Sequence, residues 1–284
     1  MKTTICKAPA SELKELNNLF IELTQKNCNQ RCKHCYIDFP LSKKVKDFIS
    51  PDMVKQALQD TKDDKIICVY LTGAEPMTHP DFNNILRLCL KRTNVCIHTN
   101  GTFINEKKAR FLKKVEEESN FEIIFKLSMD HWDELKSDDL RGRGAYRQAV
   151  YALKSLVKYD FNIILCITNY YKEDKKVLIE QFRQICAKNG FAAEKHNFVI
   201  NEYYDRSNPV KEFDGEWSSL DCEYGRILTA KGVYTCPFLA NDHRGRCGTS
   251  FKDYSVKTAL ETDCCASCIK NKELLFGINY KLFE

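Results

Sequence analysis

Three closely spaced cysteines are the residues of this 284-residue chain best suited to metal chemistry. Cys28, Cys32 and Cys35 follow a C-x3-C-x2-C pattern directly after the apolar, strand-like run 19–24. Because one short loop carries all three thiols, it can wrap a single metal centre. A mononuclear zinc site normally needs a fourth protein ligand, which only His34 could supply at this spacing. A cubane iron–sulfur cluster held by three thiolates instead keeps one iron open to a ligand that is not protein.

The bulk composition limits the classes of partner. The net charge of +5, from 44 basic and 39 acidic residues, is too small and too dispersed to indicate nucleic-acid binding. We see neither a secretory signal nor an apolar run long enough to span a bilayer, so we expect a cytoplasmic protein without a membrane partner. In that compartment, fifteen cysteines indicate metal ligands more than disulfides. Six of them lie between Cys222 and Cys268, which indicates a second metal site.

Strand-like and helix-like segments alternate over the first two thirds of the chain, which predicts parallel βαβ units. We expect an α/β fold, a partial (β/α)6 TIM-type barrel, with a doubly wound sheet as the alternative. The expected domains are a barrel over 1–200, a bridge over 201–221 and a small cysteine-rich domain over 222–284. The expected strands are 19–24, 66–71, 95–100, 121–129, 161–168 and 197–201. The expected helices begin at Ser50-Pro51 and at Phe82, or span 105–117, 146–159 and 176–188.

The cysteine loop resembles that of the radical S-adenosylmethionine (SAM) enzymes, whose signature is a C-x3-C-x-aromatic-C loop after the first barrel strand. His34 stands in the aromatic position. The resemblance implies a 4Fe–4S cluster on Cys28, Cys32 and Cys35, whose open iron chelates the amino and carboxylate groups of SAM. An electron from the cluster would then cleave SAM and release a 5′-deoxyadenosyl radical. Three core or disulfide cysteines are the alternative interpretation.

Polar motifs follow the predicted strands, where a parallel barrel gathers its functional residues. Gly73-Ala74-Glu75-Pro76 is similar to the family's G-G-E-P motif, which contacts the SAM amino group, although Ala74 replaces a glycine. Asn100, in Thr99-Asn100-Gly101, and the Ser128-x-Asp130 pair resemble further SAM-contacting elements, or ordinary turns. Arg141 matches an R-G element and could pair with the SAM carboxylate, or form a surface salt bridge. His34 and Tyr36 could flank the adenine.

The last part of the chain resembles the twitch domain, a shorter relative of the SPASM domain that follows many radical SAM barrels. The resemblance assigns one auxiliary 4Fe–4S cluster to Cys222, Cys236, Cys265 and Cys268. Cys264 could replace Cys265, because adjacent cysteines leave the register ambiguous. Six cysteines are too few for two fully ligated clusters, and a zinc ribbon is the structural alternative. Cys247 has no assigned role.

The resemblance leaves the substrate open. We expect hydrogen abstraction from a small polar metabolite, with the auxiliary cluster assisting oxidation or substrate binding, because only 27 residues precede Cys28. That is short for the leader-binding domain of many peptide-modifying relatives. The first alternative is a peptide-modifying epimerase or crosslinker in which Cys247 or Cys166 returns a hydrogen atom, although Cys166 also suits a buried core position. The second is a non-catalytic iron–sulfur or zinc protein. An electron donor such as flavodoxin or ferredoxin is the expected partner of an enzyme.

Overall fold

The computed structural model describes residues 10–37, 48–205, 221–240 and 242–271. Its centre is a run of parallel strands in which each strand pairs with the next one along the chain. This sequential order confirms the partial (β/α)6 barrel and excludes the doubly wound sheet, whose strand order reverses at a switch point. The strands are β2 (Asn18–Thr24), β3 (Cys68–Gly73), β4 (Asn94–Thr99), β5 (Ile123–Ser128), β6 (Asn162–Asn169) and β7 (Phe198–Glu202).

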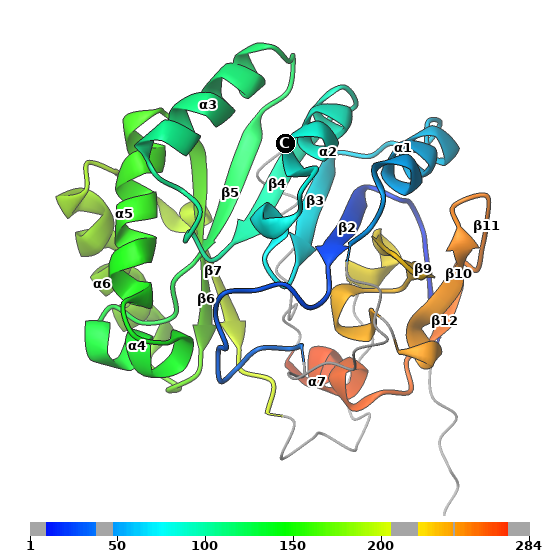
Figure 1. Cartoon of the computed structure of the whole chain (residues 1–284). Coiled ribbons are helices and arrows are strands. Elements are labelled where there is room, and N and C mark those ends of the chain that lie inside the picture. Colours follow the sequence, from blue (N-terminus) through cyan, green and yellow to red (C-terminus); the bar gives the residue numbers. More distant parts are fainter. Residues whose placement is uncertain (1–9, 38–47, 206–220, 241, 272–284) are drawn as a thin grey trace, which may run out of the picture.

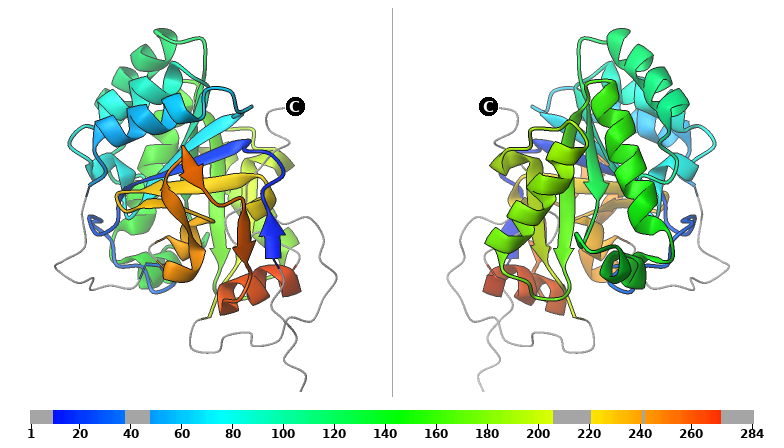
Figure 2. Two further views of the ribbon diagram at one scale, coloured as in Figure 1. Left: turned by 90° about the vertical axis from the view of Figure 1, so that its right-hand side faces the viewer. Right: turned by 90° about the vertical axis from the view of Figure 1, so that its left-hand side faces the viewer.

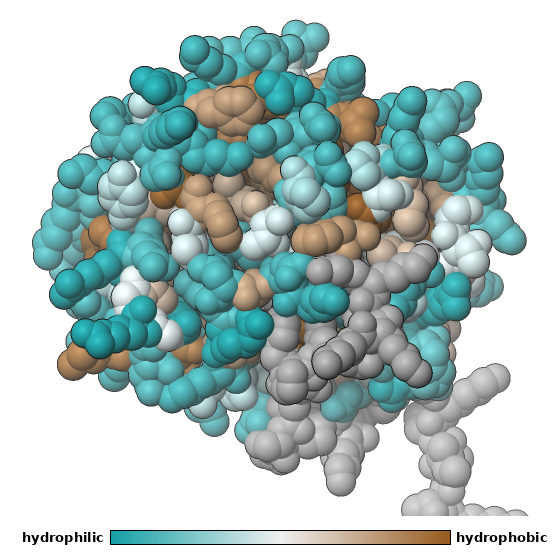
Figure 3. All heavy atoms as spheres, viewed as in Figure 1, coloured by the Kyte–Doolittle hydropathy of each residue, from teal (hydrophilic) through white to brown (hydrophobic). Residues whose placement is uncertain are grey.

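Helices cover the outer face of this sheet, as Figure 1 and the side views of Figure 2 show. The five expected helices are α1 (Pro51–Asp60), α2 (Phe82–Leu90), α3 (Glu106–Glu117), α5 (Ala145–Lys158) and α6 (Lys175–Lys188). The predicted cap of α1 is present, because the Ser50 hydroxyl accepts a hydrogen bond from the backbone N–H of Met53 at 3.2 Å. The outward faces of the helices are charged, and the surface seen in Figure 3 is mainly hydrophilic. No helix in the described ranges is both long and apolar enough to cross a membrane.

Two helices, α4 (Glu134–Arg141) in the barrel and α7 (Asp263–Asn271) in the C-terminal part, were not predicted, and α4 contributes to the site. Its buried residues are only Ser137 and Leu140, so the sequence carries no apolar stripe that would reveal it. The Asp133 side chain caps the helix by accepting from the backbone N–H of Lys136 at 2.9 Å. The helix ends at Arg141, and Gly142 follows with a φ of +107°.

The barrel strands have two apolar faces. Leu19, Ile21, Val69 and Leu71 pack outward in the large core beneath the helices. The alternate residues face the barrel interior, where the Phe20 and Tyr70 rings stack with centroids 4.4 Å apart. Because side-chain direction alternates along a strand, the interior-facing positions continue toward the carboxyl ends as Thr72, His98, Ser128, Cys166, Thr168 and Asn201, which line a cavity there.

The C-terminal part of the chain is hydrogen-bonded to the barrel. β8 (Gly225–Thr229) pairs in parallel with β2, and β9 (Gly232–Tyr234), β10 (Arg246–Ser250) and β11 (Asp253–Tyr254) continue the same sheet. A separate pair joins β1 (Ala10–Glu12) to β12 (Lys257–Ala259), and α7 (Asp263–Asn271) follows. Short 3-10 turns lie at Pro76–Thr78, Lys195–Asn197, Asp221–Glu223, Pro237–Leu239 and His243–Gly245. Residues 206–220 of the expected bridge lie outside the described residues, and the expected domain boundaries stay a prediction.

Gly73, at the end of β3, adopts a backbone conformation that a residue with a side chain rarely adopts. Gly73 has a φ of +124°, and a Cβ placed on it would lie 2.2 Å from the Thr24 carbonyl oxygen. Ala74, which replaces the second glycine of the family motif, is absent from the residues with positive φ, so its methyl group imposes no backbone strain. We expect Gly73→Ala to lower the free energy of unfolding by roughly 2–4 kcal/mol, measured by urea denaturation.

The matched control is Ala74→Gly, which should cost about 1 kcal/mol or less through chain entropy. Equal shifts of the two unfolding midpoints would contradict the geometry assigned to Gly73.

Candidate functional site

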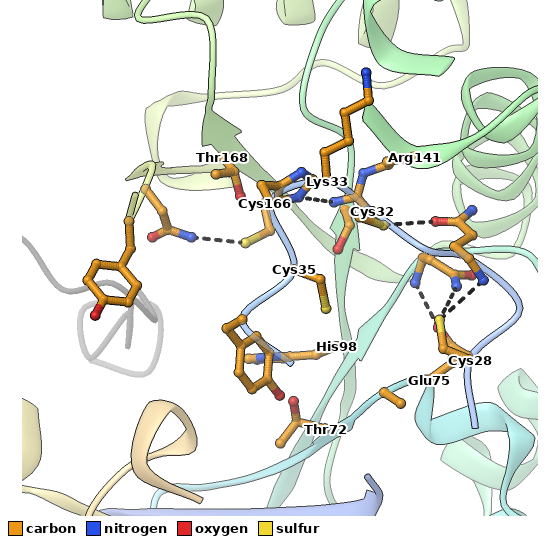
Figure 4. A pocket seen from close by; sticks show the side chains of 18 of the residues that line it. Cys28, Cys32, Lys33, Cys35, Thr72, Glu75, His98, Arg141, Cys166 and Thr168 are labelled. Carbon is orange, nitrogen blue, oxygen red and sulfur yellow. Dashed lines mark hydrogen bonds between the residues drawn. The ribbon is translucent and has the colours of Figure 1, made fainter. Parts of the chain in front are cut away.

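A cavity of about 390 Å³ lies at the carboxyl ends of the barrel strands. The loop after β2 forms one wall with Cys28, Cys32 and Cys35, and the strand ends form the others (Figure 4). The cavity therefore brings together most of the residues that the sequence singled out, although they come from separate strands. These are His34, Tyr36, Gly73, Ala74, Glu75, Asn100, Ser128 and Arg141.

The loop thiols receive N–H groups from their surroundings. Cys28 Sγ accepts from the backbone N–H of Gln30 at 3.4 Å and from Asn100 Nδ2 at 3.8 Å. Cys32 Sγ accepts from Arg141 Nη1 at 3.8 Å. Donors of this kind stabilise thiolate sulfur, so the environment fits an iron–sulfur cluster.

Burial raises the pKa of all three loop thiols, that of Cys35 to about 11, so a bound metal would have to displace their protons. Over the described parts of the chain, no three His, Cys, Asp or Glu side chains converge as ligands of one metal ion. The loop supplies three thiols, one fewer than the four ligands of a structural zinc site. A cubane held by three thiolates keeps one iron open, so this donor set fits the cluster.

Glu75 is a buried carboxyl group at the end of β3, only 1% exposed. Its oxygens accept hydrogen bonds from the Thr99 hydroxyl at 2.9 Å and from the backbone N–H groups of Asn100 at 2.9 Å and Met77 at 3.1 Å. Burial nevertheless raises its pKa from 4.5 to about 7, because these donors offset only part of the desolvation. A cationic ligand group in the cavity would restore the charged form.

Asp130 holds a second buried charge, although it is not among the described residues that line the cavity. Its carboxylate pairs with Arg141 at the end of α4, lies 3.2 Å from His34 Nε2, and accepts the backbone N–H of Thr168 at 2.8 Å. Burial alone would raise the pKa of Asp130, but Arg141 and His34 hold it below its usual value. Burial lowers the pKa of His34, which favours its neutral form. Arg141 thus has a protein partner, and its contact with a SAM carboxylate stays a prediction.

The sequence did not single out several cavity residues. Thr72, His98, Thr168 and Asn201 line the cavity, as do residues 202–205 and Phe238. Residues two apart on a strand face the same side of the sheet. His98 could therefore have been predicted from Asn100, and Thr168 from Cys166, the thiol considered as a hydrogen donor. No comparable signal marks Phe238, which comes from the C-terminal part of the chain.

The second cysteine group gathers around α7, on the side to which the arrowheads of β6 and β7 point (Figure 1). Cys236 interacts electrostatically with Cys222, Cys265 and Cys268, and Cys264 packs in the same cluster. The Thr262 hydroxyl donates to Cys265 Sγ at 3.0 Å and lies 2.9 Å from Cys264 Sγ. The interaction between the two adjacent thiols lowers the pKa of Cys265 and raises that of Cys264. This asymmetry favours Cys265 as the thiolate of the adjacent pair.

Cys247 lies apart from that group. Its thiol donates to the Gly245 carbonyl oxygen at 3.6 Å, and its sulfur lies 3.5 Å from the Thr235 hydroxyl. It packs against the large core rather than lining the cavity.

Aromatic side chains connect the cavity with the second cysteine group. The Tyr36 and Phe238 rings lie 5.5 Å apart, and Phe238 lies 6.0 Å from the Tyr204 ring. Phe238 and Tyr204 both line the cavity and also pack against the cysteines. The Tyr204 hydroxyl donates to Asp263 at the start of α7 at 2.5 Å.

The Asp130–Arg141 pair can be tested by stability. Asp130→Asn keeps the side-chain shape but leaves the Arg141 charge buried without its counter-charge, and we expect a loss of about 3–5 kcal/mol in the free energy of unfolding. Asp139→Asn is the matched control, because its pair with Lys33 joins the same loop and helix at 2.5 Å but both side chains are 52% exposed. It should change stability little. Similar urea midpoints for the two variants would refute the importance of the buried pair.

The raised pKa of Glu75 predicts a pH dependence. Between its ordinary pKa of 4.5 and its folded value of about 7, the folded protein retains a proton that the unfolded chain releases. The resulting stability is present below the lower value and is lost as pH rises through the upper one. Glu75→Gln has no carboxyl to titrate. The stability of wild type relative to this variant should therefore fall by on the order of 3 kcal/mol across that window.

Urea unfolding of the metal-free proteins at a series of pH values measures this difference. Parallel pH profiles for wild type and Glu75→Gln would show that Glu75 does not titrate in this window.

Comparisons with known proteins agree with this architecture. The chain is 24% identical over 269 residues to the antilisterial bacteriocin subtilosin biosynthesis protein AlbA of Bacillus subtilis, covering 93% of this chain and 58% of AlbA. It is 28% identical over 171 residues to a cysteine-type anaerobic sulfatase-maturating enzyme of Clostridium novyi, covering 53% of this chain and 43% of that enzyme. The chain thus spans about half the length of these curated relatives.

Two solved structures share the fold. SuiB of Streptococcus suis bound to S-adenosylmethionine superposes with a TM-score of 0.62 at 14% identity, covering 85% of this chain and 63% of SuiB. Native anSMEcpe with bound AdoMet gives a TM-score of 0.61 at 16% identity, covering 93% of this chain and 85% of that chain. At these identities the likeness concerns the fold alone.

The family match covers the barrel and its cysteine loop. The model of the radical SAM superfamily matches residues 23–181, which is more than half of the chain and includes Cys28, Cys32 and Cys35. Members of that family use a 4Fe–4S cluster and SAM as cofactors, as the loop predicts. This chain belongs to the radical SAM superfamily.

Proposed function

We propose that this chain is a radical SAM enzyme that modifies a peptide. The observation that carries the proposal is the shared cavity at the strand ends. There, the three loop thiols, two of which accept N–H groups, lie with the buried carboxyl of Glu75 and with Arg141, which pairs with Asp130. This set of groups matches what SAM presents, because the cofactor carries an amine, a carboxylate and ribose hydroxyls.

The site residues receive the following roles. Cys28, Cys32 and Cys35 hold the 4Fe–4S cluster, which when bound supplies the electron that cleaves SAM to a 5′-deoxyadenosyl radical. Glu75 accepts the ammonium group of SAM, with Gly73 and Ala74 supplying the backbone beside it. Arg141, Asn100 and Ser128 bind its ribose and carboxylate, Asp130 holds Arg141 in place, and His34 and Tyr36 lie along its adenine. The protein orients the cofactor and excludes water.

We assign an auxiliary 4Fe–4S cluster to Cys222, Cys236, Cys265 and Cys268, in keeping with a twitch-type C-terminal segment. We assign no ligand role to Cys264, whose interaction with Cys265 lowers the pKa of the Cys265 thiol. Tyr36, Phe238 and Tyr204 lie between the two cysteine groups, where they can shorten the path of an electron. A low-potential donor such as flavodoxin or ferredoxin supplies the reducing electrons.

We propose a peptide as the substrate, instead of the small metabolite that the sequence alone favoured. A bacteriocin biosynthesis protein and a sulfatase-maturating enzyme both act on polypeptides, and anSMEcpe has been solved with bound AdoMet and the Cp18Cys peptide. Residues 202–205 and Phe238 extend the cavity beyond the groups assigned to SAM, which provides a surface for a larger substrate.

The first experiment measures 5′-deoxyadenosine formed from SAM by the anaerobically reconstituted, dithionite-reduced protein. Wild type should form the nucleoside, and Cys32→Ala should abolish it. Cys186→Ala removes a buried thiol of α6, outside the cavity, and should retain it.

The peptides encoded by short reading frames next to the gene are then added, each as a synthetic peptide, beside a mixture of small polar metabolites. One peptide should raise the rate of nucleoside formation and be converted into a product that separates from it by chromatography. Stimulation by the metabolites alone would overturn the peptide assignment, and equal activity of Cys32→Ala would overturn the catalytic one.

A further inference from the structure

The cavity contains a fourth thiol that no cofactor needs. Cys166 lies in the middle of β6, where it pairs with Ser128 of β5 and Val199 of β7. The other described barrel cysteines outside the loop, Cys68, Cys89, Cys96 and Cys186, are all at most 1% exposed and do not line the cavity. Cys166 is half-buried and lines it, beside Thr168 in Figure 4.

Asn201, the neighbour of this thiol, carries a polar atom whose hydrogen-bonding capacity is not satisfied. Asn201 Nδ2 donates to Cys166 Sγ at 3.4 Å, and Asn201 lines the same cavity while only 8% exposed. Its Oδ1 has no hydrogen-bond partner within the described residues. A buried carbonyl oxygen without a donor is costly, and a peptide N–H in the cavity would satisfy it. The pair therefore offers a peptide one acceptor next to one thiol.

The thiol hydrogen of Cys166 is available. The Cys68 and Cys247 thiols donate to carbonyl oxygens, whereas the bond formed by Cys166 is one that its sulfur accepts. Burial raises the pKa of Cys166, so the group carries its hydrogen at neutral pH. A neutral thiol has a weak S–H bond and is a good hydrogen-atom donor to a carbon radical.

We propose that Cys166 returns a hydrogen atom to the peptide radical, so that the enzyme inverts a carbon stereocentre instead of oxidising it. This rests on the proposed function. The 5′-deoxyadenosyl radical takes a hydrogen atom from the peptide carbon and becomes 5′-deoxyadenosine. The Cys166 S–H bond then breaks and a new C–H bond forms on the side facing β6, leaving a thiyl radical. One electron from the low-potential donor and one proton restore the thiol.

The numbers of electrons and hydrogen atoms exchanged distinguish this reaction from an oxidation of the peptide. Each turnover consumes one SAM and two electrons, and the peptide gains and loses one hydrogen atom without a net change in mass. Asn201 acts as a positioning residue that holds the thiol and the peptide backbone. Cys247, the other thiol considered from the sequence, is separated from the cavity by its place in the C-terminal strands.

The test uses SAM as the only added substrate, in thiol-free D2O with dithionite. Cysteine thiols exchange to S–D, while thiols that bind a cluster carry no deuterium. A carbon radical breaks an S–D bond but not the stronger O–D and N–D bonds. Wild-type protein should therefore form singly deuterated 5′-deoxyadenosine, and Cys166→Ser should lose the label. The matched control is Cys96→Ala, which removes the neighbouring thiol from the barrel interior and should keep the label.

The labelling results distinguish a failure of the role of Cys166 from a failure of the proposed function. Unlabelled nucleoside from wild type, or label retained in Cys166→Ser, overturns the role of Cys166 while SAM cleavage still stands. Absence of any nucleoside from wild type overturns the proposed function instead.

A measurement without turnover tests the site itself. Iodoacetamide at alkaline pH should modify Cys166 of the cluster-loaded protein, SAM should slow this modification, and Cys96 and Cys186 should remain unmodified. Peptide mass spectrometry identifies the alkylated cysteines. An unreactive Cys166, or one that SAM does not protect, would overturn the inference even if no nucleoside forms.

Discussion

The buried ion pair between Asp130 and Arg141 is the interaction on which the site depends. Asp130 extends from the end of β5 and also accepts the backbone N–H of Thr168 on β6. Arg141 ends α4 and reaches the sulfur of Cys32 in the loop after β2. One carboxylate therefore fixes two strands, a helix and the cysteine loop relative to one another. Because charges so deeply buried are stable only when paired, a displaced loop would expose or unpair them, which confines the loop to one position.

The same pair explains how much of the fold the sequence revealed. The barrel strands and five of the helices have strong apolar patterns, and each was predicted within a few residues of its observed bounds. α4 lacks such a pattern, because contacts with the loop, including those of Arg141, hold it in place instead of an apolar face. The partner of Arg141 could not be predicted for the same reason: the sequence places Arg141 eleven residues after Asp130 but does not show the turn that brings them together.

The sequence likewise revealed some residues of the candidate site and missed others. Glu75, Asn100 and Ser128 were singled out because motifs at the ends of predicted strands resemble those of the family, and all three line the cavity. Cys166 was considered as a hydrogen-atom donor, but its place within a strand also suited a buried core position. Alternation along β6 nevertheless puts it on the interior face with Thr168, at the level where the barrel opens. Spacing left the choice between Cys264 and Cys265 open, because adjacent cysteines fit the same motif, and Cys265 stays the proposed ligand.

The architecture gives a substrate radical two possible fates. Phe238 and Tyr204 lead from the cavity to the second cysteine group, which as a cluster could accept an electron. Cys166 on β6 offers a hydrogen atom. Transfer of a hydrogen atom requires contact between the reacting atoms, whereas an electron can cross the width of an aromatic side chain. A peptide held on Asn201 meets that contact requirement at Cys166, since the same amide binds the sulfur. Under the proposed function, the placement of one amide on β7 therefore favours hydrogen return, with the second cysteine group acting on the supply of electrons rather than on the substrate.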